Sequence, residues 1–202
     1  MAIYATILHN KCRKKRASRS SNMPNLSLEK MFLDTYQTHS DAIFRFIFFK
    51  IDNRERSLDL VQETFMKTWI QITKTGELNN IRAFLYKVAS NLVIDEYRKR
   101  GKKDHFTSSL EVMSEDGFDP SSNIDELESI TNKLDGEKLM TLVNELPEAY
   151  ATVLFMRFNE DLSIGEIAES LDVSQNVVSV RINRAINKLR DLVETEINKF
   201  TK

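Results

Sequence analysis

The stretch Leu162–Arg190, LSIGEIAESLDVSQNVVSVRINRAINKLR, decides how the chain around it folds. Apolar residues in its first part recur at the spacing of one helix face: Ile164, Ile167, Ala168 and Leu171. Ser163 and Glu166 form an S-x-x-E capping box at the start of that helix. The segment Asp172–Ser174 then predicts a turn, because Asp tolerates the left-handed conformation and Ser caps a following helix well. The pattern therefore predicts a helix-turn-helix.

The second helix of this motif has one face for packing and one for recognition. Its packing face consists of apolar residues within a narrow arc at about 100° per residue: Val178, Ile182, Ala185 and Leu189. Its opposite side combines amides, a hydroxyl, cations and a valine: Gln175, Asn176, Ser179, Val180, Arg181 and Arg184. Amides and hydroxyls read base edges, cations hold phosphates, and valines contact thymine methyl groups. Two interpretations stay open at this point, a DNA-binding helix and an amphipathic hairpin that packs on another protein.

Composition favours a chain of long helices in one or two domains, since 202 residues with 41% hydrophobic content include only five Gly and three Pro. Cys12 is the only cysteine, which excludes an internal disulfide or a multi-cysteine zinc site and makes a reducing cytoplasm the expected location. The most apolar run, Ile43–Ile51, is too short to span a membrane and is interrupted by Arg45 and Lys50. We therefore expect an all-α cytoplasmic protein with no metal, no cofactor and no membrane insertion.

Charge is distributed unevenly, although the net charge is only −1. Residues 1–23 carry six basic residues and no acid, which predicts a basic, disordered N-terminal extension; a nucleic-acid-binding arm and an upstream start before Met23 are the alternatives. Residues 101–136 carry nine acids and three basic residues, and 103–136 lack a sustained apolar face. This composition predicts a flexible acidic linker between two small helical domains, 24–102 and 137–202.

The first of these domains shows the apolar spacing of several helices. One is expected over residues 26–51, with a joint at His39–Asp41 that makes it a packing hairpin. A second, Ser57–Thr73, has apolar residues at spacings of three and four: Leu58, Val61, Phe65, Trp69 and Ile72. After the loop Lys74–Asn80, a third helix is expected to bury Ile81, Phe84, Leu85, Val88 and Leu92.

Two segments of this domain carry a family resemblance. DLVQETFMKTW (59–69) and NIRAFLYKVASNLVIDEYRKR (80–100) resemble the first domain of extracytoplasmic-function sigma factors, which direct bacterial RNA polymerase to promoters. The helix-turn-helix, preceded by LPEAYATVLFMRF (146–158), resembles their second domain. The resemblance covers about residues 26–100 and 137–193 and implies an alternative sigma factor that binds core polymerase, recognises the minus-ten and minus-thirty-five elements and promotes DNA melting.

The resemblance also implies site residues, position by position. Residues that match the family's contacts with the clamp helices of the largest polymerase subunit are Asp59, Gln62, Glu63 and Phe65. Residues that match the minus-ten helix are Lys87, Asn91, Arg98, Lys99 and Arg100, and the loop 74–80 corresponds to one that captures an unstacked base. In the recognition helix the match is looser: Arg181 and Arg184 match the family. Gln175, Asn176, Ser179 and Val180 complete the expected minus-thirty-five contacts, because of their place in that helix. This chain departs from the family at Asp172, often Gly, and at Ser179, often Lys.

Further partners implied by the resemblance are the flap of the second-largest polymerase subunit and an inhibitory anti-sigma factor. Enzyme activity is not expected, because the three histidines lie far apart and no phosphate loop, H-E-x-x-H motif or nucleophile elbow occurs. Two alternatives to an initiation factor remain: a helix-turn-helix transcriptional regulator, and a sigma-like adaptor without promoter-melting activity. A regulator needs no polymerase-clamp motif beside a minus-ten helix, and promoter-specific transcription separates all three.

Overall fold

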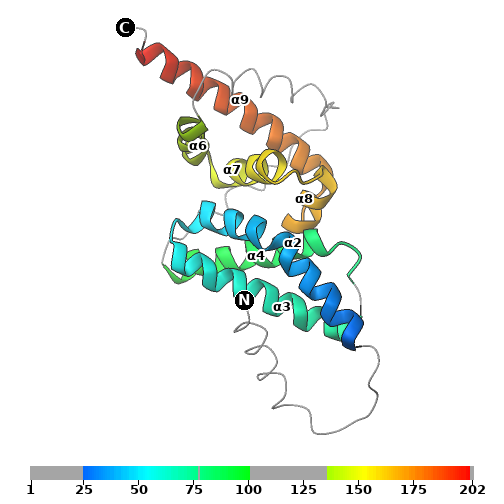
Figure 1. The fold of residues 1–202 in the computed structure, drawn as a ribbon. Coiled ribbons are helices and arrows are strands. Elements are labelled where there is room, and N and C mark those ends of the chain that lie inside the picture. The colour runs from blue at the N-terminus through cyan, green and yellow to red at the C-terminus, as the bar shows by residue number, and fades with distance from the viewer. Residues whose placement is uncertain (1–24, 77, 101–135, 201–202) are drawn as a thin grey trace.

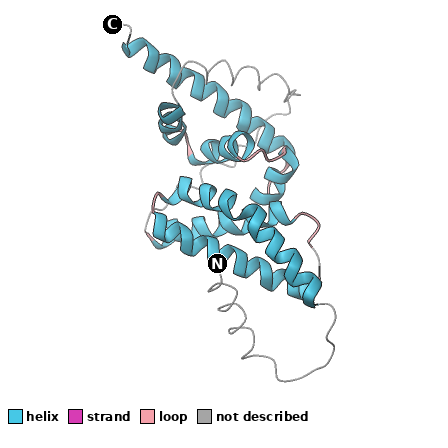
Figure 2. Ribbon diagram, viewed as in Figure 1, coloured by secondary structure: helices cyan, strands magenta, loops and turns pink. Residues whose placement is uncertain are grey.

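The computed structural model describes residues 25–76, 78–100 and 136–200. Throughout these ranges the regular structure is helical and contains no strand, which confirms the all-α prediction (Figure 2). The expected basic extension, and the expected acidic linker except for Gly136, lie outside the described residues. The helices form two groups, one from residues 25–100 and one from residues 136–200 (Figure 1).

The first group is a bundle of α2 (Asn25–Ile51), α3 (Arg54–Thr75) and α4 (Ile81–Lys99). Helix α2 is continuous, so the expected joint at residues 39–41 is wrong. No Gly or Pro interrupts residues 25–51, and the buried face continues through Ile43 and Ile47, beyond the proposed joint. Packing on both neighbouring helices thus outweighs the weak helix propensity of the His-Ser-Asp segment.

Helix α3 is capped at its start by Asn53, whose side chain accepts a hydrogen bond from the Arg56 amide, and at its end by Gly76, which has a positive φ of 87°. Its buried face is rotated from the predicted one, because Leu58 is 43% exposed and Leu60 is buried instead. Threonines widen that face without leaving unpaired hydroxyls, since each donates to the carbonyl four residues earlier: Thr64 to Leu60 at 2.7 Å and Thr68 to Thr64 at 2.9 Å.

Helix α4 is capped by Asn80, which accepts from the Ala83 amide. Of the five residues expected to be buried here, Leu85 and Leu92 are buried, whereas Ile81, Phe84 and Val88 are only half-buried. The remaining buried residues of α4 are Ala83, Tyr86, Ala89, Ser90, Val93 and Glu96. This helix therefore has a broad buried side and a narrow solvent-facing flank.

The second group consists of α6 (Gly136–Glu145), α7 (Glu148–Leu154), the π-helical turn η1 (Phe155–Asn159), α8 (Ile164–Leu171) and α9 (Gln175–Phe200). Pro147 occupies the N-cap position directly before α7. The capping box of Ser163 and Glu166 is present. Asp172 is left-handed with φ 58° and ψ 44°, and the Ser174 hydroxyl accepts from the Val177 amide at 3.3 Å. These features confirm the predicted helix-turn-helix.

The helix-turn-helix packs as the sequence indicates. Val178, Ala185 and Leu189 are fully or almost fully buried, and Ile182 is 7% exposed. Figure 1 shows α8 beside the α2–α4 bundle, while α9 runs away from that bundle towards the C-terminus. The two groups are therefore in direct contact through the start of the helix-turn-helix.

Candidate nucleic-acid interface

The exposed face of α3 carries most of the predicted polymerase-binding residues. Asp59 and Gln62 are exposed and Glu63 is half-buried, all of them outside the buried face of the helix. Asp59 lies 3.6 Å from the Arg56 guanidinium, and Glu63 pairs with Lys67 at 3.1 Å. These side chains therefore lie where a partner can reach them.

Phe65 does not belong to that surface. Its burial contradicts the prediction that its side chain contacts polymerase directly. Its side chain is 3% exposed. Its ring centroid lies 4.8 Å from that of Tyr36 and 6.2 Å from that of Phe32, in edge-on packing. Phe65 falls on the side of α3 that faces α2, so it can support the surface only through the core.

The same exposed face also contains apolar residues that the sequence reasoning missed. Leu58, Met66 and Ile70 are exposed large hydrophobic residues of α3. With Gln62 they are spaced by four residues, which places them along one helix face. That spacing was the available signal, but the prediction used only Leu58, which it placed in the buried stripe. Exposed apolar residues beside polar ones are typical of a protein-binding surface.

Helix α4 presents a cationic flank. Asn91, Arg98, Lys99 and Arg100 are exposed, and Lys87 is half-buried. Arg98 pairs with Asp95 at 3.3 Å, and Arg100 pairs with Glu96 at 3.0 Å. The Lys87 ammonium lies 3.4 Å from the Asp172 carboxylate, in the turn of the helix-turn-helix. The predicted minus-ten residues thus share one helix, and one of them contacts the second group.

Glu96 organises the basic end of this helix. It accepts from Arg56 at 2.7 Å and from Arg100 at 3.0 Å. These hydrogen bonds, with the Arg56 bond as the largest cause, hold the pKa of the Glu96 carboxyl below its usual value. The carboxylate therefore stays charged and joins the start of α3 to the end of α4.

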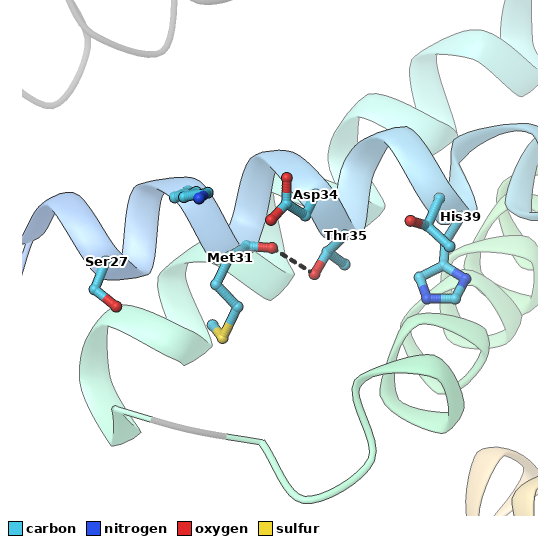
Figure 3. A pocket seen from close by; sticks show the side chains of 7 residues that line it. Ser27, Met31, Asp34, Thr35 and His39 are labelled. Carbon is cyan, nitrogen blue, oxygen red and sulfur yellow. Dashed lines mark hydrogen bonds between the residues drawn. The ribbon is translucent and has the colours of Figure 1, made fainter.

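A shallow pocket lies along one side of α2. It has a volume of about 440 Å³ and is lined by residues of α2: Ser27, Lys30, Met31, Asp34, Thr35, Thr38 and His39. Figure 3 shows Met31 and His39 pointing to the side of α2 where the α3–α4 connection runs. Burial, with a smaller contribution from the Arg82 charge, lowers the pKa of His39, which favours the neutral imidazole. The pocket thus offers uncharged and charged polar groups beside a flexible apolar side chain.

The recognition helix α9 exposes its N-terminal residues. Gln175 and Asn176 are exposed, whereas Ser179, Val180, Arg181 and Arg184 are half-buried. The Ser179 hydroxyl donates to the Gln175 carbonyl at 3.1 Å, so it is already paired within the helix. Val177 is exposed beside them. The amides at the start of α9 are therefore the base-reading groups with the best access to a groove.

Neither a metal centre nor a membrane helix is found in the described parts of the chain. No group of three or more His, Cys, Asp or Glu residues there is arranged to hold a metal ion. Likewise, none of the described helices combines the length and apolarity required for a membrane span. Within these ranges, the exposed features are amides at the start of α9, a cationic flank on α4 and a mixed polar and apolar face on α3. These features are typical of a protein that binds DNA through two elements and also binds a protein partner.

Comparisons with known proteins place this class of protein in a family. Residues 35–103 match the family description "Sigma-70 region 2", and residues 136–189 match "Sigma-70, region 4". The chain is 28% identical to the extracytoplasmic-function (ECF) sigma factor SigW of Bacillus subtilis over 169 residues, covering 79% of this chain and 87% of SigW. It is also 28% identical to the sigma factor SigV of the same organism, covering 75% of this chain and 84% of SigV.

A solved structure shows the same fold. The sigma factor RpoE from Bartonella quintana, crystallised with the anti-sigma factor NepR, superposes with a TM-score of 0.59 at 21% identity, covering 82% of this chain and 98% of that one. With both family matches in chain order, this chain belongs to the sigma-70 family, within its extracytoplasmic-function group. It is an alternative sigma factor, a DNA-binding factor of transcription initiation.

Proposed function

We propose that this sigma factor divides promoter recognition between its domains, 24–102 and 137–202, and opens the promoter with the first. The observation that carries the proposal is the exposed amide of Asn91 on a cationic flank of α4. A base that leaves the duplex stack needs a polar edge reader, and a melted strand needs cations. A factor that reads only duplex DNA does not need an edge-reading amide beside cations that hold a single strand.

Core polymerase binds the exposed face of α3 in this proposal. Asp59, Gln62 and Glu63 supply charge and hydrogen bonds for orientation, while Leu58 and Met66 supply apolar area at the centre. The combination suits a protein partner better than DNA, because acidic residues repel phosphates. The clamp helices of the largest polymerase subunit are the proposed partner, and the flap of the second-largest subunit is proposed to contact the second domain.

The minus-ten element is held by α4. Asn91 donates and accepts at the edge of an unstacked base, and Lys87, Arg98, Lys99 and Arg100 attract the strand. Unpairing and unstacking a base cost a few kcal/mol, which the specific contacts must offset. The pocket of Met31 and His39 on α2 is the proposed place for the unstacked base, because it combines polar groups with an apolar side chain.

The minus-thirty-five element is read by α9. Gln175 and Asn176 lie at the helix N-terminus, the part that enters the major groove in helix-turn-helix proteins. Arg181 and Arg184 hold phosphates, and Val180 faces thymine methyl groups. Because Ser179 replaces the lysine that the family often has, electrostatic attraction by this helix is expected to be weaker than in relatives.

Three further parts of the proposal concern the cell. The protein acts in the cytoplasm, where polymerase and promoters are found, and it has no catalytic activity of its own. An anti-sigma factor inhibits it, as the complex of RpoE with NepR suggests by analogy. The exposed apolar residues of α3 are a surface that such an inhibitor can cover, in competition with polymerase.

Run-off transcription with purified core polymerase and a promoter library tests the proposal. Transcripts from a defined subset of promoters, dependent on this chain, are the expected result. Asp59→Ala with Gln62→Ala should reduce both core binding and transcript yield, whereas Glu29→Ala, an exposed acid on α2, should change neither. Core binding without any transcript would favour the adaptor, and duplex binding without core binding would favour the regulator.

A further inference from the structure

An acidic side chain is buried in a strongly basic part of the first domain. Glu96 lies in the last turn of α4, beside Arg98, Lys99 and Arg100, and its side chain is only 10% exposed. A negative charge is unfavourable there on two counts, because it opposes the helix dipole at a C-terminus and repels a nearby phosphate. An acid at this position therefore needs a specific role.

The two oxygens of the Glu96 carboxylate have different partners. Oε2 accepts from Arg56 Nη2 at 2.7 Å, which joins the start of α3 to the end of α4. Oε1 accepts from Arg100 Nε at 3.0 Å, within the same stretch of chain. The bond from Arg56 is enough to join the two helices, so the bond from Arg100 serves another purpose.

The charges of these three groups leave one positive charge uncompensated. Glu96 balances one arginine, and Arg56 also lies 3.6 Å from the exposed Asp59 carboxylate. Both acids are therefore close to Arg56, whereas Arg100 contacts only one of them. The Arg100 side chain is 38% exposed, so its charge remains accessible to an anion.

The bond to Glu96 uses the nitrogen of Arg100 that a phosphate needs least. It occupies Nε, and among the described residues neither Nη atom of Arg100 bonds to another group. Two terminal nitrogens of a guanidinium can donate parallel hydrogen bonds to one phosphate. Arg98 differs, because its pair with Asp95 at 3.3 Å uses Nη1 and joins two exposed side chains. Such a surface pair holds its arginine only weakly.

The backbone beneath Arg100 is also fixed. Its amide donates to the Glu96 carbonyl at 3.1 Å, and the Tyr97 hydroxyl donates to the Lys50 carbonyl near the end of α2. The end of α4 is thus attached to both other helices of the bundle. A side chain that is already held on a fixed backbone loses less conformational freedom when it binds a ligand.

We propose that Glu96 is a positioning residue of the minus-ten site, which orients Arg100 through Nε so that its two Nη atoms bind one phosphate of the unpaired strand. Arg56 supports this role by holding the other oxygen of the carboxylate. The inference rests on the proposed function, in which α4 holds the melted strand. Glu96 itself does not touch the DNA and acts only through Arg100.

A double-mutant cycle in strand binding tests this role. The probe is a single-stranded oligonucleotide with the minus-ten region of a promoter recovered by run-off transcription, bound to holoenzyme at saturating core polymerase. Glu96→Gln should weaken binding about three- to tenfold, because one neutral acceptor oxygen no longer holds both arginines firmly and Arg100 regains its rotamer freedom. In an Arg100→Ala background the same change should not weaken binding. Arg100→Ala alone should lower the salt slope by about 0.7 units.

Two matched variants separate positioning from charge and from folding. Asp95→Asn removes the exposed acid beside Arg98 and should leave strand binding unchanged or slightly tighter, in contrast to Glu96→Gln. Arg56→Gln removes the bond between α3 and α4 but keeps the bond from Arg100, so it should lower the free energy of unfolding and largely preserve strand affinity. If Glu96→Gln weakens binding equally in both backgrounds, or Arg56→Gln weakens it as much, Glu96 has only a structural role and the proposal is refuted.

A measurement without DNA separates this proposal from the proposed function. NMR relaxation of the arginine Nε–H groups in the full chain should show a restricted Arg100 and a mobile Arg98, and Glu96→Gln should make Arg100 as mobile as Arg98. An Arg100 group that is already as mobile in the unvaried chain would overturn the positioning. If Arg100 is restricted but the holoenzyme binds no strand from any promoter, its orientation by Glu96 is supported and the proposed minus-ten function fails.

Discussion

Phe65→Ala tests most directly whether this residue belongs to the hydrophobic core or to the polymerase-binding surface. The substitution removes a ring that is 3% exposed and packs edge-on against Tyr36 and Phe32. Truncating a buried Phe to Ala typically costs about 3–5 kcal/mol. A domain of about 80 residues has a free energy of unfolding of roughly 4–12 kcal/mol, at about 0.05–0.15 kcal/mol per residue. The variant should therefore lose a large part of the stability of the first domain.

Urea unfolding, monitored by tryptophan fluorescence, measures this loss of stability in the first domain. Trp69 is the only tryptophan, and its ring lies 5.0 Å from Phe32, within the same aromatic cluster. Phe65→Leu retains part of the volume and should give an intermediate midpoint. Asp59→Ala, at an exposed position, should change the free energy of unfolding by less than about 0.5 kcal/mol.

The opposite result would restore a contact role for Phe65. If Phe65→Ala unfolds at the same urea concentration as the unvaried chain and yet loses core-polymerase affinity, the ring is not core and the packing argument is wrong. Loss of affinity only in proportion to the unfolded fraction is the expected outcome. Affinity measured at a temperature where the variant is folded distinguishes the two cases.

Three further predictions concern the DNA-binding surfaces and the dependence of the free energy of unfolding on pH. Arg184→Ala should weaken binding about equally for all sequences and lower the salt slope by about one unit, whereas Asn176→Ala should change the preferred minus-thirty-five sequence. Asn91→Ala should reduce the permanganate reactivity of unpaired thymines far more than it reduces closed-complex binding. A template mismatched across the minus-ten region should relieve part of the defect. Asn187→Ala, which removes an exposed amide of α9, is the control. The pKa of Glu96 is lowered chiefly by its hydrogen bond from Arg56, so its stabilising contribution is present above its normal pKa and is lost as pH falls through the lowered value. Glu96→Gln should therefore lower stability at pH 7 and flatten its acid dependence, as measured by urea unfolding between pH 7 and pH 3.

Local signals in the sequence were sufficient for the helix-turn-helix. The Ser163 capping box, the left-handed Asp172 and the cap at Ser174 depend only on residues three or four positions away. Backbone sterics and hydrogen bonding act over the same range, which is why a single sequence predicts them. The same reasoning placed exposed amides at the start of α9 and a cationic flank on α4.

The spacing of apolar residues predicted less well which side chains are buried. Apolar spacing shows that α3 has a buried face but not where that face is centred, because the two neighbouring helices decide it. Leu58 and Leu60 are equally apolar, and only the positions of α2 and α4 expose one and bury the other. The continuity of α2 through residues 39–41 has the same origin, since tertiary packing overrides weak local propensity.

Contacts between the domains lay wholly beyond the sequence pattern. Glu160 and Arg45 are 115 residues apart in the chain, and each taken alone is an ordinary surface residue. A buried carboxylate is favourable only when donors from other elements surround it, and no periodicity encodes which donors those are. By itself the sequence determined most of the helices, the caps of the helix-turn-helix and the family. The tertiary structure decided the continuity of α2, which side chains are buried and which charges meet, because these depend on residues distant in the chain.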